Sequence, residues 1–156
     1  MLSFMGRARS NTTFSANAAV VLVGAERSLL ALEELLGWSR EVHFAFAWAS
    51  SSRGLARHWR ALDVARVVRG VVGIHFAQTE PYALRVMAAA GGRIRVRIDT
   101  EGTFHPKLIV GVRGDRVRAL VGSSNFTEGG FGANTEVNVA LERASSSAEA
   151  TELVAA

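Results

Sequence analysis

The sequence of 156 residues contains no cysteine, only two prolines and one tyrosine. The absence of cysteine excludes disulfide bonds and thiolate metal sites. No apolar run approaches the roughly 18 residues that a membrane-spanning helix needs, because the longest candidates, 18–25 and 42–49, are only as long as strands. The first residues resemble a signal peptide only weakly, since a polar stretch at 11–15 interrupts them. We therefore expect a cytoplasmic protein that does not enter a membrane.

Lysine is almost absent as well, because Lys107 is the one lysine among 18 basic residues. Arginine carries a flat guanidinium and lysine a compact ammonium, so the two side chains are not interchangeable in a tight anion site. In a chain that otherwise uses arginine, the position of Lys107 indicates a requirement for an ammonium group. Chance is the alternative explanation for a single surviving lysine.

The composition is that of a single globular domain. Hydrophobic residues make up 49% of the chain and charged residues 21%, which at this length suffices for one core. We expect a domain over residues 18–156, preceded by an N-terminal arm over 1–17 whose weak pattern permits disorder. The formal net charge of +4 and the pI near 10.9 favour a polyanionic partner such as nucleic acid.

Helical and extended patterns alternate along the chain. Helical spacing or capping predicts helices over 26–36, after Ser51 and Ser52, between Thr79 and Gly91, and from Ser147 onward. Strand patterns cover 42–49, 70–76, 93–98, 105–112, 116–121 and 135–141, with a hairpin turn at 113–115. This order predicts an α/β fold in which helices flank a mixed β-sheet. Gly37 is expected to end the first helix, and Ser146 with Glu149 has capping-box spacing for the last.

A histidine and the lysine lie two positions apart within the strand predicted over 105–112. Side chains two apart on a strand point to the same side, so His105 and Lys107 project together, roughly 6.5–7 Å apart along the chain. An imidazole and an ammonium can then converge on one anion. A histidine on its own is more often structural, so the residues that follow decide between the two interpretations.

The next strand runs into a polar turn at 122–125, with the sequence Gly-Ser-Ser-Asn. Its hydroxyl and carboxamide groups are neutral donors for phosphate oxygens, and Gly122 permits close backbone approach. The glycine-rich segment at 129–132 is either a mobile lip over a site or a simple turn. Beyond it, Glu136 begins a strand, where its carboxylate is able to receive one nitrogen of a histidine and fix the tautomer.

Three elements in this order, His-Pro-Lys at 105–107, Gly-Ser-Ser-Asn at 122–125 and the glutamate at 136, resemble the HxK…GSxN…E signature of the phospholipase D superfamily. The similarity is closest to its small single-motif nucleases and to the phospholipase-D-like domains attached to restriction enzymes and helicases. The resemblance implies a phospholipase-D-like fold and a phosphodiesterase that needs no metal and no cofactor.

The resemblance also implies roles for the motif residues. His105 would be the nucleophile, and Glu136 would orient it. The residues implied to hold the phosphate are Lys107, Ser123 and Asn125, flanked by Gly122 and Ser124. One position departs from the pattern, because the family often has an aspartate five positions after the lysine, where this chain has Val112. In the family this aspartate takes no part in the chemical step. The change therefore argues against full activity more than against membership of the family.

Arg93, Arg95 and Arg97 alternate with apolar residues in the strand predicted over 93–98, so they share one face. That face is either a binding track for a phosphate backbone or the solvated side of a half-buried sheet. The remaining histidines lie in apolar or amphipathic segments and are interpreted as core or edge residues: His43, His58 and His75. The tryptophans are interpreted as core or helix packing: Trp38, Trp48 and Trp59.

The expected function is endonucleolytic hydrolysis of DNA in two steps, through a phosphohistidine. Because the motif occurs once, the second histidine must come from another copy, which predicts a homodimer with a shared site. The alternative is a non-catalytic nucleic-acid-binding module that works with a helicase or a restriction partner. RNA and a phospholipid headgroup stay open as substrates, although no apolar membrane-facing segment is evident.

Overall fold

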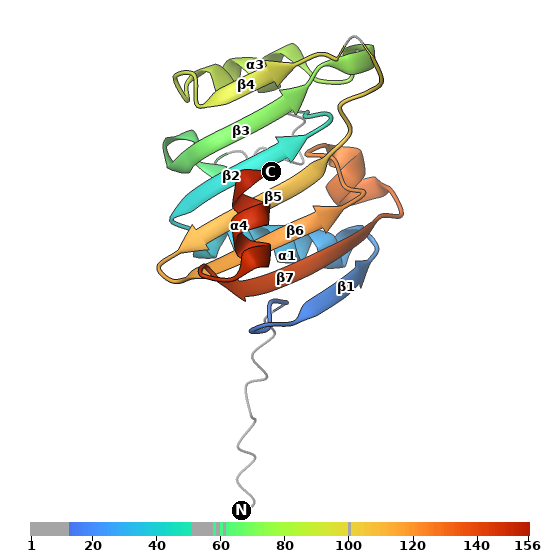
Figure 1. The fold of residues 1–156 in the computed structure, drawn as a ribbon. Helices are drawn as coiled ribbons and strands as arrows, with labels where there is room; N and C mark the ends of the chain where they lie inside the picture. The colour runs from blue at the N-terminus through green and yellow to red at the C-terminus, as the bar shows by residue number, and fades with distance from the viewer. Residues whose placement is uncertain (1–12, 51–57, 59, 61, 100) are drawn as a thin grey trace, which may run out of the picture.

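A computed structural model of the chain describes residues 13–50, 58, 60, 62–99 and 101–156 (Figure 1). The start of the helix expected after Ser51 and Ser52, and most of the expected N-terminal arm, lie outside the described residues. Within that arm, Phe14 is 2% exposed and belongs to the hydrophobic core. The arm therefore contributes at least one side chain to the packing of the domain.

Among the described residues, seven strands form one sheet in the order β1-β7-β6-β5-β2-β3-β4. The strands are β1 (Ala19–Val23), β2 (Glu41–Phe46), β3 (Val67–Gly73), β4 (Ile94–Arg97), β5 (Lys107–Arg113), β6 (Arg116–Gly122) and β7 (Val137–Ala144). The pairs β2–β3 and β3–β4 are parallel, and the other neighbours are antiparallel. The predicted mixed sheet of an α/β fold is therefore confirmed.

Helices flank both faces of this sheet, as predicted. α1 (Ala25–Trp38) and α4 (Ala148–Ala155) lie on opposite faces, and α3 (Pro81–Ala88) lies beside β4 (Figure 1). The described residues also include three short helical turns: η2 (Val64–Arg66), η3 (His75–Ala77) and η4 (Gly129–Ala133). Within the described part of the chain, no helix has the length and apolarity needed to cross a membrane.

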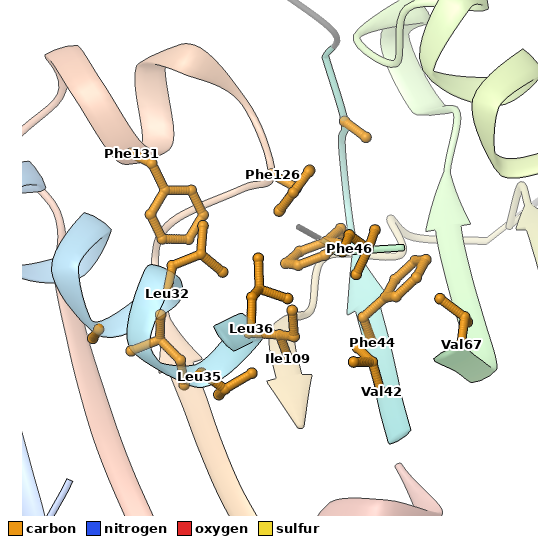
Figure 2. Packing of buried hydrophobic residues seen from close by; sticks show 14 of the residues in the cluster. Leu32, Leu35, Leu36, Val42, Phe44, Phe46, Val67, Ile109, Phe126 and Phe131 are labelled. Carbon is orange, nitrogen blue, oxygen red and sulfur yellow. The ribbon is translucent and has the colours of Figure 1, made fainter. Parts of the chain in front are cut away.

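The main core lies between α1 and the sheet (Figure 2). Leu32 and Leu36 are fully buried, because residues four apart share one face of a helix. They belong to one cluster with Phe46 of β2, Ile109 of β5 and Phe126, whose ring centroid lies 5.1 Å from that of Phe46. Since Phe126 directly follows the polar turn after β6, this core fixes the position of that turn.

The strand register brings the sequence motif to one end of the sheet. β2 ends at Phe46, which pairs with Lys107 at the start of β5. β6 ends at Gly122, which pairs with Asn138 near the start of β7. Because antiparallel neighbours run in opposite directions, these ends and beginnings lie together. β3 and β4 run parallel to β2 and end on the same side. We call this side of the sheet the motif end.

Two predicted helix boundaries are wrong, and a side-chain hydrogen bond explains each. Gly37 lies inside α1, and Ser39 closes the helix by donating its hydroxyl to the Leu35 carbonyl at 2.6 Å. α4 is capped by Ser147 rather than Ser146, since the Ser147 hydroxyl accepts a backbone N–H of the first helical turn at 3.1 Å. The bond to Ser147 satisfies a backbone N–H that the helix itself leaves open.

Candidate active site

His105 and Lys107 lie together at the motif end. His105 is exposed and precedes β5, whereas Lys107 is the half-buried first residue of that strand. Lys107 Nζ lies 2.8 Å from His105 Nδ1 and donates to the His105 carbonyl at 3.0 Å. The carbonyl of Pro106 accepts the N–H of Ala47 at 2.8 Å, which fastens the pair to the end of β2. The fold thus brings the imidazole and the ammonium to one point.

The ring of Trp48 lies beside this pair. Its ring centroid lies 5.1 Å from that of His105 in an edge-to-face arrangement, and Lys107 Nζ lies 5.5 Å from the ring centroid. An ammonium near an aromatic face is attracted by the ring quadrupole. The backbone N–H of Trp48 donates to Asn125 Oδ1 at 3.1 Å, which connects Trp48 to the polar turn. The interpretation of Trp48 as core packing is therefore wrong, because its ring contacts both motif residues.

Glu136 lies beside the polar turn, where two side chains hold its carboxylate. Ser123 Oγ donates to one carboxylate oxygen, and Asn134 Nδ2 donates to the other at 3.1 Å. The N–H of Val137 in turn donates to Ser123 Oγ at 3.0 Å. Alignment of His105 by this glutamate stays a prediction, because the hydrogen bonds of the carboxylate in the described structure go to Ser123 and Asn134.

Beneath the turn, a buried polar layer ties it to α1. Asn138 Nδ2 donates to Ser124 Oγ and to Ser28 Oγ, each at 2.8 Å. All three side chains are at most 2% exposed, so loss of one bond would leave a desolvated polar group. Ser124, expected beside the substrate, lies in this supporting layer. Gly122 has no room for a side chain, because a Cβ would lie 2.3 Å from the Val137 carbonyl oxygen.

A polar cavity of about 360 Å³ opens next to Glu136. Its lining comes from segments far apart in the sequence and consists of Trp48, Ser50, Gln78, Glu80, Asn125, Thr127, Gly130, Asn134 and Glu136. Sequence reasoning selected Asn125 and Glu136 for the site but missed Ser50 and Gln78. Ser50 and Gln78 lie just beyond the ends of β2 and β3. In the sequence, their position after these two strands was the one feature that could have identified them.

The three arginines around β4 have different surroundings. Arg93 is occupied by the backbone, since its guanidinium donates to two carbonyls of residues 64–65 at 3.0 and 3.1 Å. Arg95 lies on the exposed edge strand. Arg97 lies at the motif end, with its guanidinium carbon 5.1 Å from the ring centroid of Phe104 and its Nε donating to Asp99 Oδ1 at 2.6 Å. Arg97 is therefore the one of the three that lies next to the motif, whereas the hydrogen bonds of Arg93 stabilise the fold.

Val112, which occupies the position of the family's aspartate, lies far from this site. It pairs with Glu41 at the beginning of β2, the strand end opposite the motif. It lies five positions after Lys107 along β5, which is roughly 16–17 Å at the rise of an extended strand. The departure from the family pattern therefore leaves the surroundings of Lys107 unchanged.

Two of the remaining histidines are bound by groups outside the motif. His58 is buried, with Nε2 3.1 Å from a carboxylate oxygen of Glu33. His75 is also buried, and its Nε2 accepts the N–H of Asp99 at 2.9 Å. Across the residues that the structure describes, no three histidine or acidic side chains gather into a group that could hold a metal ion.

Burial and charge set the protonation of the two motif residues. Burial lowers the pKa of His105, and the neighbouring Lys107 ammonium lowers it further. Burial also lowers the pKa of Lys107, and the carboxylate of Glu136 opposes that shift. A histidine with a lowered pKa is neutral at neutral pH, which is the form that a nucleophilic imidazole requires.

In an NMR titration we expect the ring protons of His105 to titrate below the usual histidine range. Lys107→Met removes a repelling charge from beside the protonated imidazole, so this variant should titrate at higher pH. His43, whose pKa burial also lowers, lies within β2 and should keep its midpoint in the variant. An unchanged His105 midpoint would contradict an electrostatic link between the two motif residues.

Comparisons of sequence point to one family. Residues 72–155 match the family described as "Cardiolipin synthase, PLD-like domain". The match covers more than half of the chain and includes all motif residues from His105 to Glu136. No curated protein matches the chain.

Solved structures share the fold at low sequence identity. Nuc from Salmonella typhimurium, a phospholipase D family member, aligns with a TM-score of 0.55 and 20% identity, covering 79% of this chain and 82% of Nuc. NucT from Helicobacter pylori gives a TM-score of 0.52 and 16% identity, covering 79% and 84%. A variant of yeast tyrosyl-DNA phosphodiesterase gives 0.51 and 14%, covering 79% of this chain and 32% of the yeast chain. At identities this low, the structural alignments show a common fold.

Proposed function

The chain belongs to the phospholipase D superfamily, and from that premise we propose that it is a metal-independent phosphodiesterase that hydrolyses DNA. The observation that carries the proposal is the contact between His105 and Lys107, with Nζ 2.8 Å from Nδ1, beside a turn of neutral hydrogen-bond donors. A phosphodiester carries one negative charge. An ammonium with neutral donors suits that charge, and the imidazole beside it supplies a nucleophile.

The proposed reaction has two steps. In the first, a neutral nitrogen of His105 attacks phosphorus, the bond to one ester oxygen breaks, and a phosphohistidine forms. A second, protonated histidine gives its proton to the leaving oxygen. In the second step that histidine takes a proton from water, whose oxygen attacks phosphorus and releases the first imidazole. Lys107, Ser123 and Asn125 stabilise charge on the non-bridging oxygens, the task that metal ions perform in other nucleases.

The basic charge of the chain and one enzyme of the same fold favour DNA as the substrate. The formal net charge is +4, which attracts a polyanion. The yeast tyrosyl-DNA phosphodiesterase acts, by its name, on DNA. Arg97 lies beside Phe104 at the motif end, where its guanidinium is paired with Asp99 and adds no unpaired charge. RNA and a phospholipid headgroup are the competing substrates.

The second histidine of the mechanism is proposed to be His105 of another copy. The other described histidines, His43, His58 and His75, have no lysine or serine–asparagine turn beside them. A two-fold axis close to the site would supply an identical imidazole by placing identical surfaces in contact. It would also bring two Lys107 ammonium groups together, which is tolerable only with an anion between them. Phosphate or sulfate should therefore stabilise the dimer.

Incubation of the pure protein with single- and double-stranded DNA in excess chelator tests the proposed activity. We expect cleavage to continue under chelation, because imidazole and ammonium groups carry out the chemistry. Its rate should have a bell-shaped pH dependence, since one histidine must be neutral while the other is charged. RNA and a phospholipid serve as alternative substrates in the same assay.

Two outcomes would contradict the proposal. Loss of activity in chelator, with recovery on adding magnesium, would contradict the metal-free mechanism. Tight binding of DNA with no cleavage under any condition would instead identify a binding module that serves a helicase or a restriction enzyme.

A further inference from the structure

The loop after β3 presents an exposed phenylalanine on an unusual backbone. β3 ends at Gly73, earlier than the sequence indicated, and the chain then turns through η3. Phe76 has a φ of 60° and a ψ of 18°, and Ala77 follows with a φ of 54°. The left-handed region is unfavourable for residues that carry a Cβ. The Phe76 side chain is 70% exposed, more than any other large apolar residue in the described part of the chain.

Hydrogen bonds fix this loop at both ends. The N–H of Ile74 donates to the Arg97 carbonyl at 3.1 Å, which ties the loop to the end of β4. Thr79 Oγ1 donates to the Gly73 carbonyl at 2.6 Å and accepts the N–H of Ala49 at 3.2 Å, which ties the loop to the segment after β2. The segment that carries the exposed ring is therefore anchored at both ends.

Fold stability gives no reason for a phenylalanine at position 76. An exposed ring gains little from burial, and glycine or asparagine would adopt the same backbone with less strain. Residues held in sparsely populated backbone regions cluster at functional sites, where the strain has a use. The combination of strain and exposure therefore indicates a binding role for Phe76.

The loop lies at the motif end, next to the candidate active site. Gln78 lines the polar cavity together with Glu136, and its side-chain amide donates to the Phe76 carbonyl at 3.4 Å. Arg97, whose carbonyl holds the start of the loop, has its guanidinium over Phe104, the residue before the catalytic histidine. A polymer bound at the motif therefore passes an aromatic ring and a guanidinium.

We propose that Phe76 stacks on a nucleobase next to the phosphate bound at His105 and thereby selects single-stranded nucleic acid. The inference rests on the proposed function, because it assigns a substrate class to the same site. An aromatic side chain stacks on the free face of any base, whereas in a duplex neighbouring base pairs cover these faces.

Binding of two labelled oligonucleotides of equal length tests the stacking. One is oligothymidylate, and the other has the same phosphates on abasic sugars. Both are measured by fluorescence anisotropy at one salt concentration, in the His105→Ala background to prevent cleavage. Phe76→Ala should weaken binding of oligothymidylate about fivefold or more and change binding of the abasic strand less than about twofold. Phe76→Tyr should bind like the parent.

The matched control is Val68→Ala, which removes an exposed apolar side chain at the start of β3, away from the motif end. This control should alter neither affinity. Phe76→Asn separates binding from folding, because asparagine accepts a left-handed backbone. It should melt at no lower temperature than the parent and still lose the preference for bases.

Equal weakening of both oligonucleotides by Phe76→Ala would overturn the inference, and so would no weakening of either. Dissociation of the dimer with the base preference retained would place Phe76 at a protein interface and would equally overturn it. Absence of cleavage in the chelator experiment would contradict the proposed function alone, because the anisotropy measurement needs no turnover.

Discussion

Replacement of His105 by alanine is expected to lower the rate of phosphodiester hydrolysis by at least about a thousandfold. In the proposed mechanism this imidazole is the nucleophile in one copy and the acid in the other, so the variant lacks both groups. The side chain is exposed and precedes β5, so the melting temperature should stay close to that of the parent. Initial rates and thermal melts on the same samples check both parts.

His43→Ala is the matched histidine control. His43 lies within β2, pairs with Val110, and lines a separate cavity that also contains Val112. Its removal should therefore leave the rate of hydrolysis unchanged. Turnover of His105→Ala within about tenfold of the parent would show that another group makes the attack on phosphorus.

Lys107→Arg is expected to lower turnover about a hundredfold, although it preserves the charge. The Lys107 ammonium is half-buried, 2.8 Å from His105 Nδ1 and 5.5 Å from the centre of the Trp48 ring. A guanidinium is wider and planar, so it would displace one of these rings. The loss should fall on kcat rather than KM, because the ammonium stabilises charge that develops in the transition state.

Arg95→Lys makes the reverse exchange on the edge strand β4 and serves as the control for this substitution. It should leave kcat unchanged, since Arg95 lies outside the group formed by the motif residues. Turnover of Lys107→Arg within a few-fold of the parent would show that the single lysine of the chain is accidental.

The order of helices and strands was predictable because it follows from local patterns. In α1, Leu32, Leu35 and Leu36 recur at helical spacing and are all buried against the sheet. The apolar character of β2 on both faces fits its place between β5 and β3, within the sheet. The close approach of His105 to Lys107 was predictable for the same reason, because two residues on one strand need no distant partner.

Contacts between distant segments were not predictable from local patterns. β2 pairs with β5 more than 50 positions later, and this pairing puts Trp48 against His105, where sequence reasoning expected core packing. Arg93 and Arg97 look equivalent on one strand, but the carbonyls and the aromatic ring that distinguish them come from other segments. The left-handed conformation of Phe76 likewise results from anchoring at both ends of its loop.

The activity of mixed dimers is the most direct test of a site shared by two copies. Parent and His105→Ala chains are co-refolded in varied proportions at constant total protein, and the rate of DNA hydrolysis is measured for each mixture. A mixed dimer lacks one of the two histidines, so the account predicts a rate that falls as the square of the parent fraction. A linear fall, or full activity of a monomer at the assay concentration, would contradict it.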